Sequence, residues 1–143
     1  MPKAYQRNFI VKFVNTLVTF LTKLGIAPKN QYILEVKGRK SGKIYTTPVI
    51  LVVENTRRWL VSPYGEVQWV KNARAVGQVT LKRKGLTETV TITEIDGTER
   101  GEILKKYLKL ASITQPYFNV SVDATLEAFE AEGKLHPVFS ISV

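Results

Sequence analysis

The sequence predicts an antiparallel α+β fold, most simply a small barrel or half barrel, and three observations support this prediction. Six short runs are rich in Val, Ile, Thr and aromatic residues, as strands are. Tight turns join several of these runs in hairpin order. Only a few helical patterns interrupt the series. The six predicted strands cover residues 32–36, 45–53, 58–62, 78–83, 86–94 and 137–143.

The first part of the chain has the pattern of an amphipathic helix over residues 6–24, where apolar side chains recur at spacings of three and four. Gly25 and Pro28 end this helix. Polar residues break its apolar run, which falls short of the roughly 20 residues that cross a bilayer. We therefore expect the helix to dock on the domain, with peripheral membrane contact as the alternative.

The rest of the chain completes a single predicted domain over residues 1–143, in which residues 29–143 form the barrel with its helices. Pro48 has no N–H, so we expect it at an edge or a bulge of the second strand, where a ligand could approach. Alternating Thr residues give the fifth strand one polar face. The other predicted elements are a helix over residues 67–74, a helix from Asp96 or Thr98 to Leu110, an irregular stretch over residues 111–122, and a short acidic helix capped by Asp123 and ending at Gly133.

The net charge of +9 is concentrated in the middle of the chain. Residues 29–84 contain twelve Lys or Arg and three Glu, whereas acidic and basic residues balance elsewhere. This segment is therefore expected to meet an anionic partner, such as a phosphorylated small molecule, nucleic acid or an anionic membrane. Nucleic-acid binding is disfavoured, because few aromatic side chains are interleaved with these cations.

Several classes of chemistry lack the residues they need. The chain has no Cys, which removes disulfides and thiol chemistry and fits a reducing, cytoplasmic location. His136 is the only histidine, so a histidine metal site or a Ser-His-Asp triad is disfavoured and no metal is expected. The sequence motifs of dinucleotide-binding folds, P-loop NTPases, zinc proteases and α/β-hydrolases do not occur.

The most informative stretch is residues 37–43, Lys-Gly-Arg-Lys-Ser-Gly-Lys, between the first two predicted strands. Gly38 and Gly42 can adopt positive φ at little steric cost, so the backbone can turn tightly and aim N–H groups at one point. Arg39 adds a planar bidentate donor and Lys40 a point charge, which are complementary ways to bind a phosphate. A solvated hairpin turn is the alternative interpretation.

Other candidate site residues follow this turn. Residues 62–65, Ser-Pro-Tyr-Gly, form a loop after the third strand, and Trp69 and Asn72 share one face of the short helix. Together with the edge at Pro48, these parts suit a phosphorylated, flat, aromatic cofactor whose own ring carries the reaction. The alternative for the last pair is a core tryptophan with a capping asparagine.

These motifs resemble the deazaflavin-dependent nitroreductase and quinone reductase family. The resemblance rests on the segment from Gly38 to Pro48, on the Trp69 and Asn72 pair, and on the closing strand at residues 136–139. It implies a split β-barrel of the FMN-binding type and an oxidoreductase that uses the deazaflavin coenzyme F420. The expected reaction is hydride transfer to a quinone, enone or nitro compound.

The resemblance also implies residue roles. The family's turn that holds the phosphate of the cofactor tail matches Arg39, Lys40 and Ser41, and its strand edge beside the ring matches Thr47 and Pro48. Its loop near the ring matches Ser62, Pro63, Tyr64 and Gly65. Its cofactor wall matches Trp69 and Asn72. Tyr117 matches a tyrosine in a lid segment. Protonation of the product would come from water or from a hydroxyl of Ser62, Tyr64 or Tyr117.

Two departures from the family pattern concern binding. Tyr45 and Thr47 stand where better-known members carry a basic residue and an asparagine, and the loop before Trp69 is shorter. We therefore expect weaker binding of the tail and a differently shaped substrate pocket. The alternatives are an FMN-binding reductase with the same barrel, or a non-catalytic module that binds a flavin, haem or a fatty acyl chain. Split barrels commonly pair, so a homodimer is one expected assembly.

Overall fold

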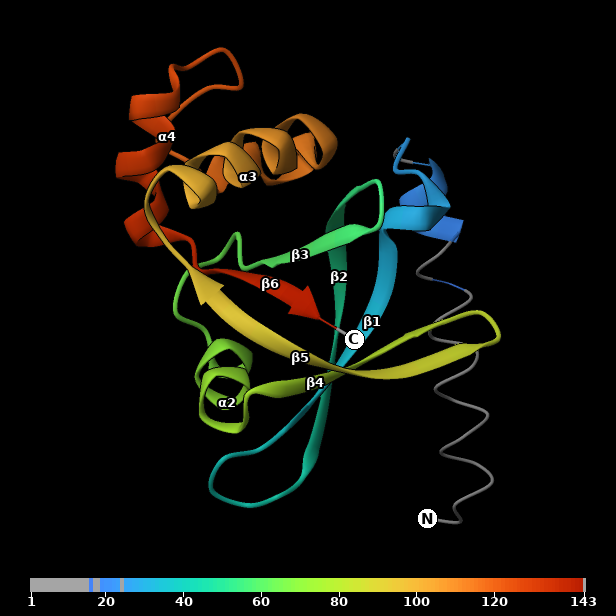
Figure 1. Ribbon diagram of the computed structural model, residues 1–143. Helices are drawn as coiled ribbons and strands as arrows, with labels where there is room; N and C mark the ends of the chain where they lie inside the picture. Colours follow the sequence, from blue (N-terminus) through green and yellow to red (C-terminus); the bar gives the residue numbers. More distant parts are fainter. Residues whose placement is uncertain (1–15, 17–18, 24, 143) are drawn as a thin grey trace.

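The computed structural model describes residues 16, 19–23 and 25–142. Its described part is organised around a closed barrel of six antiparallel strands, ordered β1-β2-β3-β6-β5-β4, with β4 pairing back to β1 (Figure 1). The mainly antiparallel α+β barrel is therefore confirmed, and each strand end lies within one residue of its predicted position. The strands are β1 (Gln31–Lys37), β2 (Ile44–Glu54), β3 (Arg57–Val61), β4 (Gln78–Arg83), β5 (Leu86–Ile95) and β6 (Val138–Ser142).

The helices α2, α3 and α4 and three short 3-10 turns flank the barrel in the described part of the chain. α3 and α4 lie side by side over one end of it, whereas α2 lies next to β1 and β4 (Figure 1). Of the amphipathic helix predicted over residues 6–24, residues 16 and 19–23 are helical and the others lie outside the described residues. No helix in the described part has the length and hydropathy of a membrane span. The elements are α2 (Gln68–Val76), α3 (Gly97–Leu110), α4 (Leu126–Glu132), η1 (Pro28–Asn30), η2 (Ser112–Tyr117) and η3 (Gly133–Leu135).

The core has two parts, because each strand buries alternate side chains. One cluster fills the barrel, with Leu34, Leu51 and Leu60 fully buried among its members. The other lies between the barrel and the helices α3 and α4, where Leu104 and Phe129 are fully buried. The polar face predicted for the fifth strand is confirmed, because the Thr residues of β5 are exposed while its Val90 and Ile92 are buried.

The cap predicted for the acidic helix is wrong. Thr125, not Asp123, occupies the N-cap position of α4, where its Oγ1 accepts a 3.2 Å hydrogen bond from the Ala128 N–H. Asp96 does take the N-cap position of α3, although its side chain makes no capping hydrogen bond. The stretch expected to be irregular contains the 3-10 turn η2.

Strand β2 extends beyond its neighbour β3, so among the described residues part of β2 has a strand partner on one side only. Pairing between β2 and β3 begins at Leu51, whereas the residues from Ile44 to Ile50 pair with β1 alone. Pro48 lies opposite Ile33 in this half, so it stands at a local edge as predicted. The register with β1 runs without interruption, which excludes a bulge at this point. The open edge is the first element of the site.

Candidate active site

The basic turn between β1 and β2 is tight, and its two glycines act differently. Gly42 has a φ of +73°, as expected, but the φ of Gly38 is not positive. Gly38 is needed instead for a close approach, because a Cβ there would lie 2.8 Å from Cε2 of Tyr45 and 2.9 Å from Oγ of Ser41. The Gly38 N–H donates to the Lys43 carbonyl at 2.7 Å and closes the turn.

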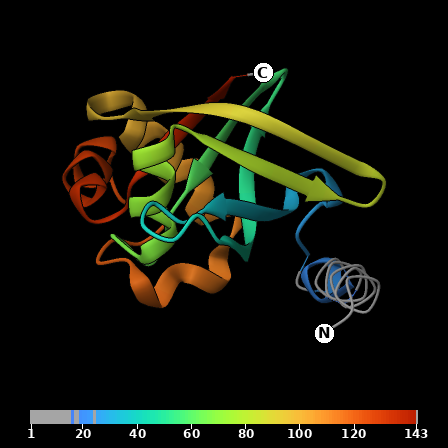
Figure 2. The ribbon, with the colours of Figure 1, turned by 90° about the horizontal axis from the view of Figure 1, so that it is seen from below.

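The turn lies beside α2 (Figure 2). Arg39 and Asn72 attach the two to each other. The Asn72 Oδ1 accepts hydrogen bonds from the backbone N–H of Arg39 at 3.1 Å and from its Nη1 at 2.6 Å. Gln68 Oε1 accepts a third bond from the same Nη1 at 3.2 Å. Asn72 is buried and caps no helix, since the N-cap and C-cap of α2 are Val67 and Gly77. The capping interpretation of Asn72 is therefore wrong.

A cleft of about 390 Å³ lies between the turn and α2. Three cationic or polar residues of the turn, Arg39, Lys40 and Ser41, line one side, and Trp69 and Asn72 line the other. No carboxylate contributes to this lining. The N–H groups of Lys40 and Ser41 have no partner among the described residues, so the cleft offers positive charge together with unused donors.

A second cavity of about 410 Å³ lies on the other side of Trp69. Its lining is mostly apolar and includes the open edge of β2, at Thr47 and Pro48, and the half-buried ring of Trp69. The described end of the N-terminal helix contributes Phe20 and Leu21. Trp69 thus lines both spaces, one basic and one apolar.

The loop predicted near the ring forms part of the mouth of this cavity. Pro63 and Tyr64 line it, whereas Ser62 is fully buried and donates its Oγ hydrogen to the Gly65 carbonyl at 2.6 Å. Gly65 has a φ of +87°, which favours glycine there. Tyr64 is exposed, and its ring meets that of Tyr117 edge to face, with 4.6 Å between ring centroids. Of the three hydroxyls predicted to supply a proton, only those of Tyr64 and Tyr117 are exposed.

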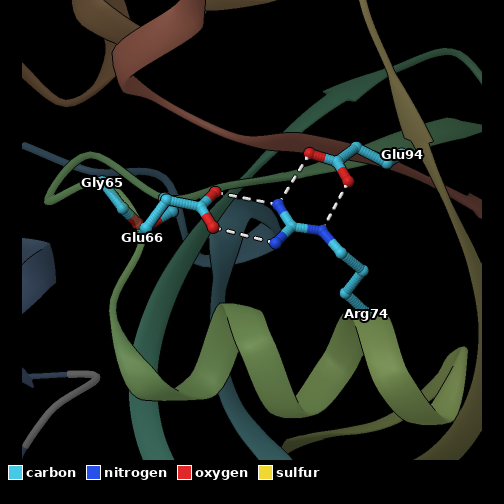
Figure 3. A network of polar contacts seen from close by, with 5 residues as sticks. Gly65, Glu66, Arg74 and Glu94 are labelled. Carbon is cyan, nitrogen blue, oxygen red and sulfur yellow. Dashed lines mark hydrogen bonds and ion pairs between the residues drawn. The ribbon is translucent and has the colours of Figure 1, made fainter.

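An ion-pair network holds the same loop against the barrel (Figure 3). Arg74 of α2 binds both carboxylate oxygens of Glu66 at 2.8 Å and those of Glu94 of β5 at 2.7 and 3.0 Å. The Arg74 guanidinium holds the pKa of Glu66 below its usual value of 4.5. The loop is therefore fixed at the residue that follows Gly65.

His136 anchors the other side of the loop. Its Nδ1 lies 2.9 Å from the Pro63 carbonyl, which can only accept, so Nδ1 carries the proton. Its Nε2 lies 2.7 Å from Oε2 of Glu132, and this oxygen accepts a hydrogen bond from the Asn119 N–H at 3.1 Å. The ring of Phe118 stacks on the imidazole at 4.0 Å. Both ring nitrogens of His136 and one face of its ring are therefore in contact with neighbouring residues. The described residues contain no group of three or more potential metal ligands.

The predicted site residues therefore fall into three groups. Those of the phosphate turn and the cofactor wall meet across the basic cleft, and Thr47, Pro48, Pro63, Tyr64 and Trp69 meet at the apolar cavity. Ser62, Gly65 and Tyr117 lie behind or beside that lining. Sequence reasoning missed Gln68 as a site residue, although its spacing of four from Asn72 places both on one helical face. It also treated Tyr107 only as part of the apolar stripe of α3, yet Tyr107 lines the cavity.

Comparisons with known proteins identify the family and the fold. A family model described as F420H(2)-dependent quinone reductase matches residues 7–126. Among solved structures, an F420-H2 dependent reductase (FDR-A) is 21% identical, with a TM-score of 0.56 over 80% of this chain and 95% of that one. A chain described as a domain-swapped dimer is 18% identical, with a TM-score of 0.58 over 96% and 99%. Protein Atu2129 of Agrobacterium tumefaciens, of unknown function, is 13% identical, with a TM-score of 0.59 over 80% and 48%.

At these identities the structural likeness shows the fold alone. None of the proteins with curated descriptions matches the chain. The family match, however, spans most of the sequence and includes the basic turn, the open strand edge and both Trp69 and Asn72. The chain therefore belongs to the F420H(2)-dependent quinone reductase family, a family of oxidoreductases that use the deazaflavin coenzyme F420.

Proposed function

We propose that this chain transfers a hydride from reduced F420 to a quinone, enone or nitro-type acceptor. The observation that carries the proposal is the position of Trp69, which lines both the basic cleft and the apolar cavity. A cofactor with an anionic tail in the cleft would place its planar ring beside this indole. The cavity beyond it would then receive the acceptor.

The residues of the cleft fit an anionic tail. Arg39 and Lys40 supply charge, and the unused N–H groups of Lys40 and Ser41 supply directed donors. Asn72 and Gln68 take part indirectly, because their side-chain carbonyls hold Arg39 in place. In this proposal Arg39, Lys40 and Ser41 bind the phosphate, and Asn72 orients the turn.

The residues around the cavity fit a flat ring. Thr47 and Pro48 present an open strand edge, Trp69 forms a wall, Pro63 adds a buried apolar surface, and the exposed Tyr64 lies at the mouth. When bound in its reduced form, F420 supplies the hydride, so the chain itself needs to orient the reactants and exclude water. Ser62 shapes the loop through its bond to Gly65. The exposed hydroxyls of Tyr64 and Tyr117 are the side-chain candidates that, with water, complete protonation.

A titration of the purified protein with F420, FMN and FAD tests the cofactor part of the proposal. We expect F420 to bind most tightly, and reduced F420 to be consumed when menadione is added. The double variant Arg39→Ala/Lys40→Ala should bind F420 more weakly, with a loss that shrinks at high salt. The control double variant Lys84→Ala/Lys109→Ala removes the same amount of positive charge from positions outside the cleft. It should bind F420 with the affinity of the wild type. Equal F420 affinity in the two double variants would remove the turn from the mechanism.

The assembly and location of the protein stay predictions. One protein of similar fold is described as a domain-swapped dimer, and we propose a homodimer for this chain as well. Light scattering coupled to size-exclusion chromatography measures its mass directly. Peripheral membrane contact through residues 6–24 concerns a segment that is largely outside the described residues.

A further inference from the structure

The apolar cavity beside Trp69 has polar groups at its buried end. Four hydroxyl side chains line the cavity: Thr47, Tyr64, Tyr107 and Thr114. Tyr64 is 57% exposed and lies at the mouth, whereas Tyr107 and Thr114 are only 2% and 3% exposed. An acceptor that fills the cavity would therefore meet the last two hydroxyls at its inner end, away from water.

Tyr107 and Thr114 are not equivalent, because Thr114 has already used its only proton. The Thr114 Oγ1 donates to the Ala111 carbonyl at 2.7 Å, so it presents lone pairs to its surroundings. Its side chain lies next to the Tyr107 phenol and acts to lower the pKa of that group. A phenol O–H can rotate about its C–O bond, so it can turn from Thr114 to a ligand oxygen. Tyr107 is thus the donor at this end.

The phenol also stays protonated. Burial, with a smaller effect of the nearby Tyr64, raises the pKa of Tyr107 well above its ordinary value of 10. At neutral and mildly alkaline pH the side chain therefore offers a hydrogen bond and does not act as a base. A neutral donor in an apolar cavity suits a carbonyl oxygen, whereas an apolar molecule of the same shape gains no hydrogen bond there.

We propose that Tyr107, supported by Thr114, is the hydrogen-bond donor that fixes a carbonyl oxygen of the acceptor at the buried end of the cavity. This inference rests on the proposed function, because it takes the cavity as the acceptor site. It selects carbonyl acceptors, such as quinones and enones, over apolar molecules of the same shape. The phenol holds the oxygen on which negative charge develops as hydride is transferred, and water supplies the proton.

Two probes of nearly equal shape test the proposal without cofactor. Menadione carries two carbonyl oxygens, and 2-methylnaphthalene has the same fused rings with none. Binding of each is followed by quenching of tryptophan fluorescence, since Trp69 lines the cavity. Wild-type protein should bind menadione more tightly than 2-methylnaphthalene. Tyr107→Phe should weaken the binding of menadione by about 3- to 10-fold, the factor typical of one neutral hydrogen bond. It should leave the binding of 2-methylnaphthalene unchanged.

The matched control is Tyr32→Phe, which removes a phenol hydroxyl from a buried tyrosine that does not line the cavity. Its affinity for both probes should equal that of the wild type. The proposal is overturned if Tyr107→Phe loses affinity equally for both probes, or if its affinity for menadione does not fall. If Tyr107→Phe does not fold, the affinities of the wild-type protein for the two probes still test the proposal. Equal affinity for menadione and 2-methylnaphthalene overturns it.

Turnover separates this inference from the proposed function. If F420 does not bind or reduced F420 is not consumed, the proposed function fails, whereas the two probes still report whether Tyr107 binds a carbonyl. If turnover occurs, Tyr107→Phe should lower kcat/KM for menadione by at least the factor lost in binding, with F420 affinity unchanged. Turnover of menadione by Tyr107→Phe at the wild-type kcat/KM overturns the role of the phenol.

Discussion

The carboxamide of Asn72 joins the basic turn to α2, and its removal tests how the cleft is built. In Asn72→Ala the backbone N–H of Arg39 and its Nη1 both lose their acceptor, at 3.1 and 2.6 Å. Only the exposed 3.2 Å bond from Nη1 to Gln68 is left to hold the guanidinium. We expect the turn to separate from α2 in part of the molecules and the cleft to lose its shape.

The size of the effect follows from the two bonds. A neutral hydrogen bond contributes about 0.5–1.5 kcal/mol and one with a charged donor about 1.5–3 kcal/mol. Arg39 is exposed although Asn72 is buried, so the lower ends apply and their sum is about 2 kcal/mol. If F420 binds only the docked turn, its affinity should fall by up to about 30-fold.

Fluorescence titration with F420 measures this change in affinity, and two further variants serve as controls for its cause. Gln68→Ala loses a single bond that is exposed to water, which reduces its contribution, and should weaken F420 binding by no more than about 3-fold. Asn72→Asp keeps the acceptor for Arg39 but adds negative charge to the cleft, so it should stay as stable as the wild type and bind F420 more weakly. Wild-type affinity in Asn72→Ala would refute the reasoning, because the turn would then not depend on α2.

Three other predictions concern the surroundings of the site. Gly38→Ala places a Cβ against the ends of Tyr45 and Ser41, which can move, so the midpoint of urea unfolding should change little while F420 affinity falls; unchanged affinity would mean that Tyr45 can move without disturbing the turn. Glu132→Ala leaves the His136 Nε2 and the Asn119 N–H without their partner and should lower the free energy of unfolding by about 2–6 kcal/mol in urea, the cost of two unsatisfied buried polar groups. Glu132→Gln is its control, and an equal loss in the two variants would show that charge alone is important. Arg74→Met should destabilise by under about 1 kcal/mol at pH 7, since the ion pairs are exposed. Because Arg74 lowers the pKa of Glu66 in the folded state, this contribution is present above the ordinary pKa of 4.5 and is lost as pH falls through the lowered value. A difference between wild type and Arg74→Met that persists in acid would contradict this origin.

The strands could be predicted because their signal is local. Alternating side chains and Gly-containing turns fix the ends of β4 and β5, and a missing N–H places Pro48 at an edge. The error at α4 has the same origin, since Asp123 and Thr125 are both good capping residues and nothing near them in the sequence decides between them.

The site was predicted only in part, because its contacts are long-range. The glycine-flanked turn and the spacing of Trp69 and Asn72 indicated a cofactor site, but the bond from Arg39 to Asn72 joins residues 33 positions apart. His136 and Pro63 are 73 positions apart, so no local pattern could link the histidine to the loop. Tyr107 lines the cavity because of how α3 docks on the barrel, and helical periodicity shows only that the residue is buried.

The open half of β2 has a consequence for how molecules of this protein meet in solution. A row of free amides and carbonyls would ordinarily template another chain, and a foreign strand laid along it would seal the opening beside Trp69. Pro48 interrupts the row of donors at its middle, which makes such addition unfavourable. Pro48 therefore both borders the opening beside Trp69 and disfavours the addition of a strand from a second molecule.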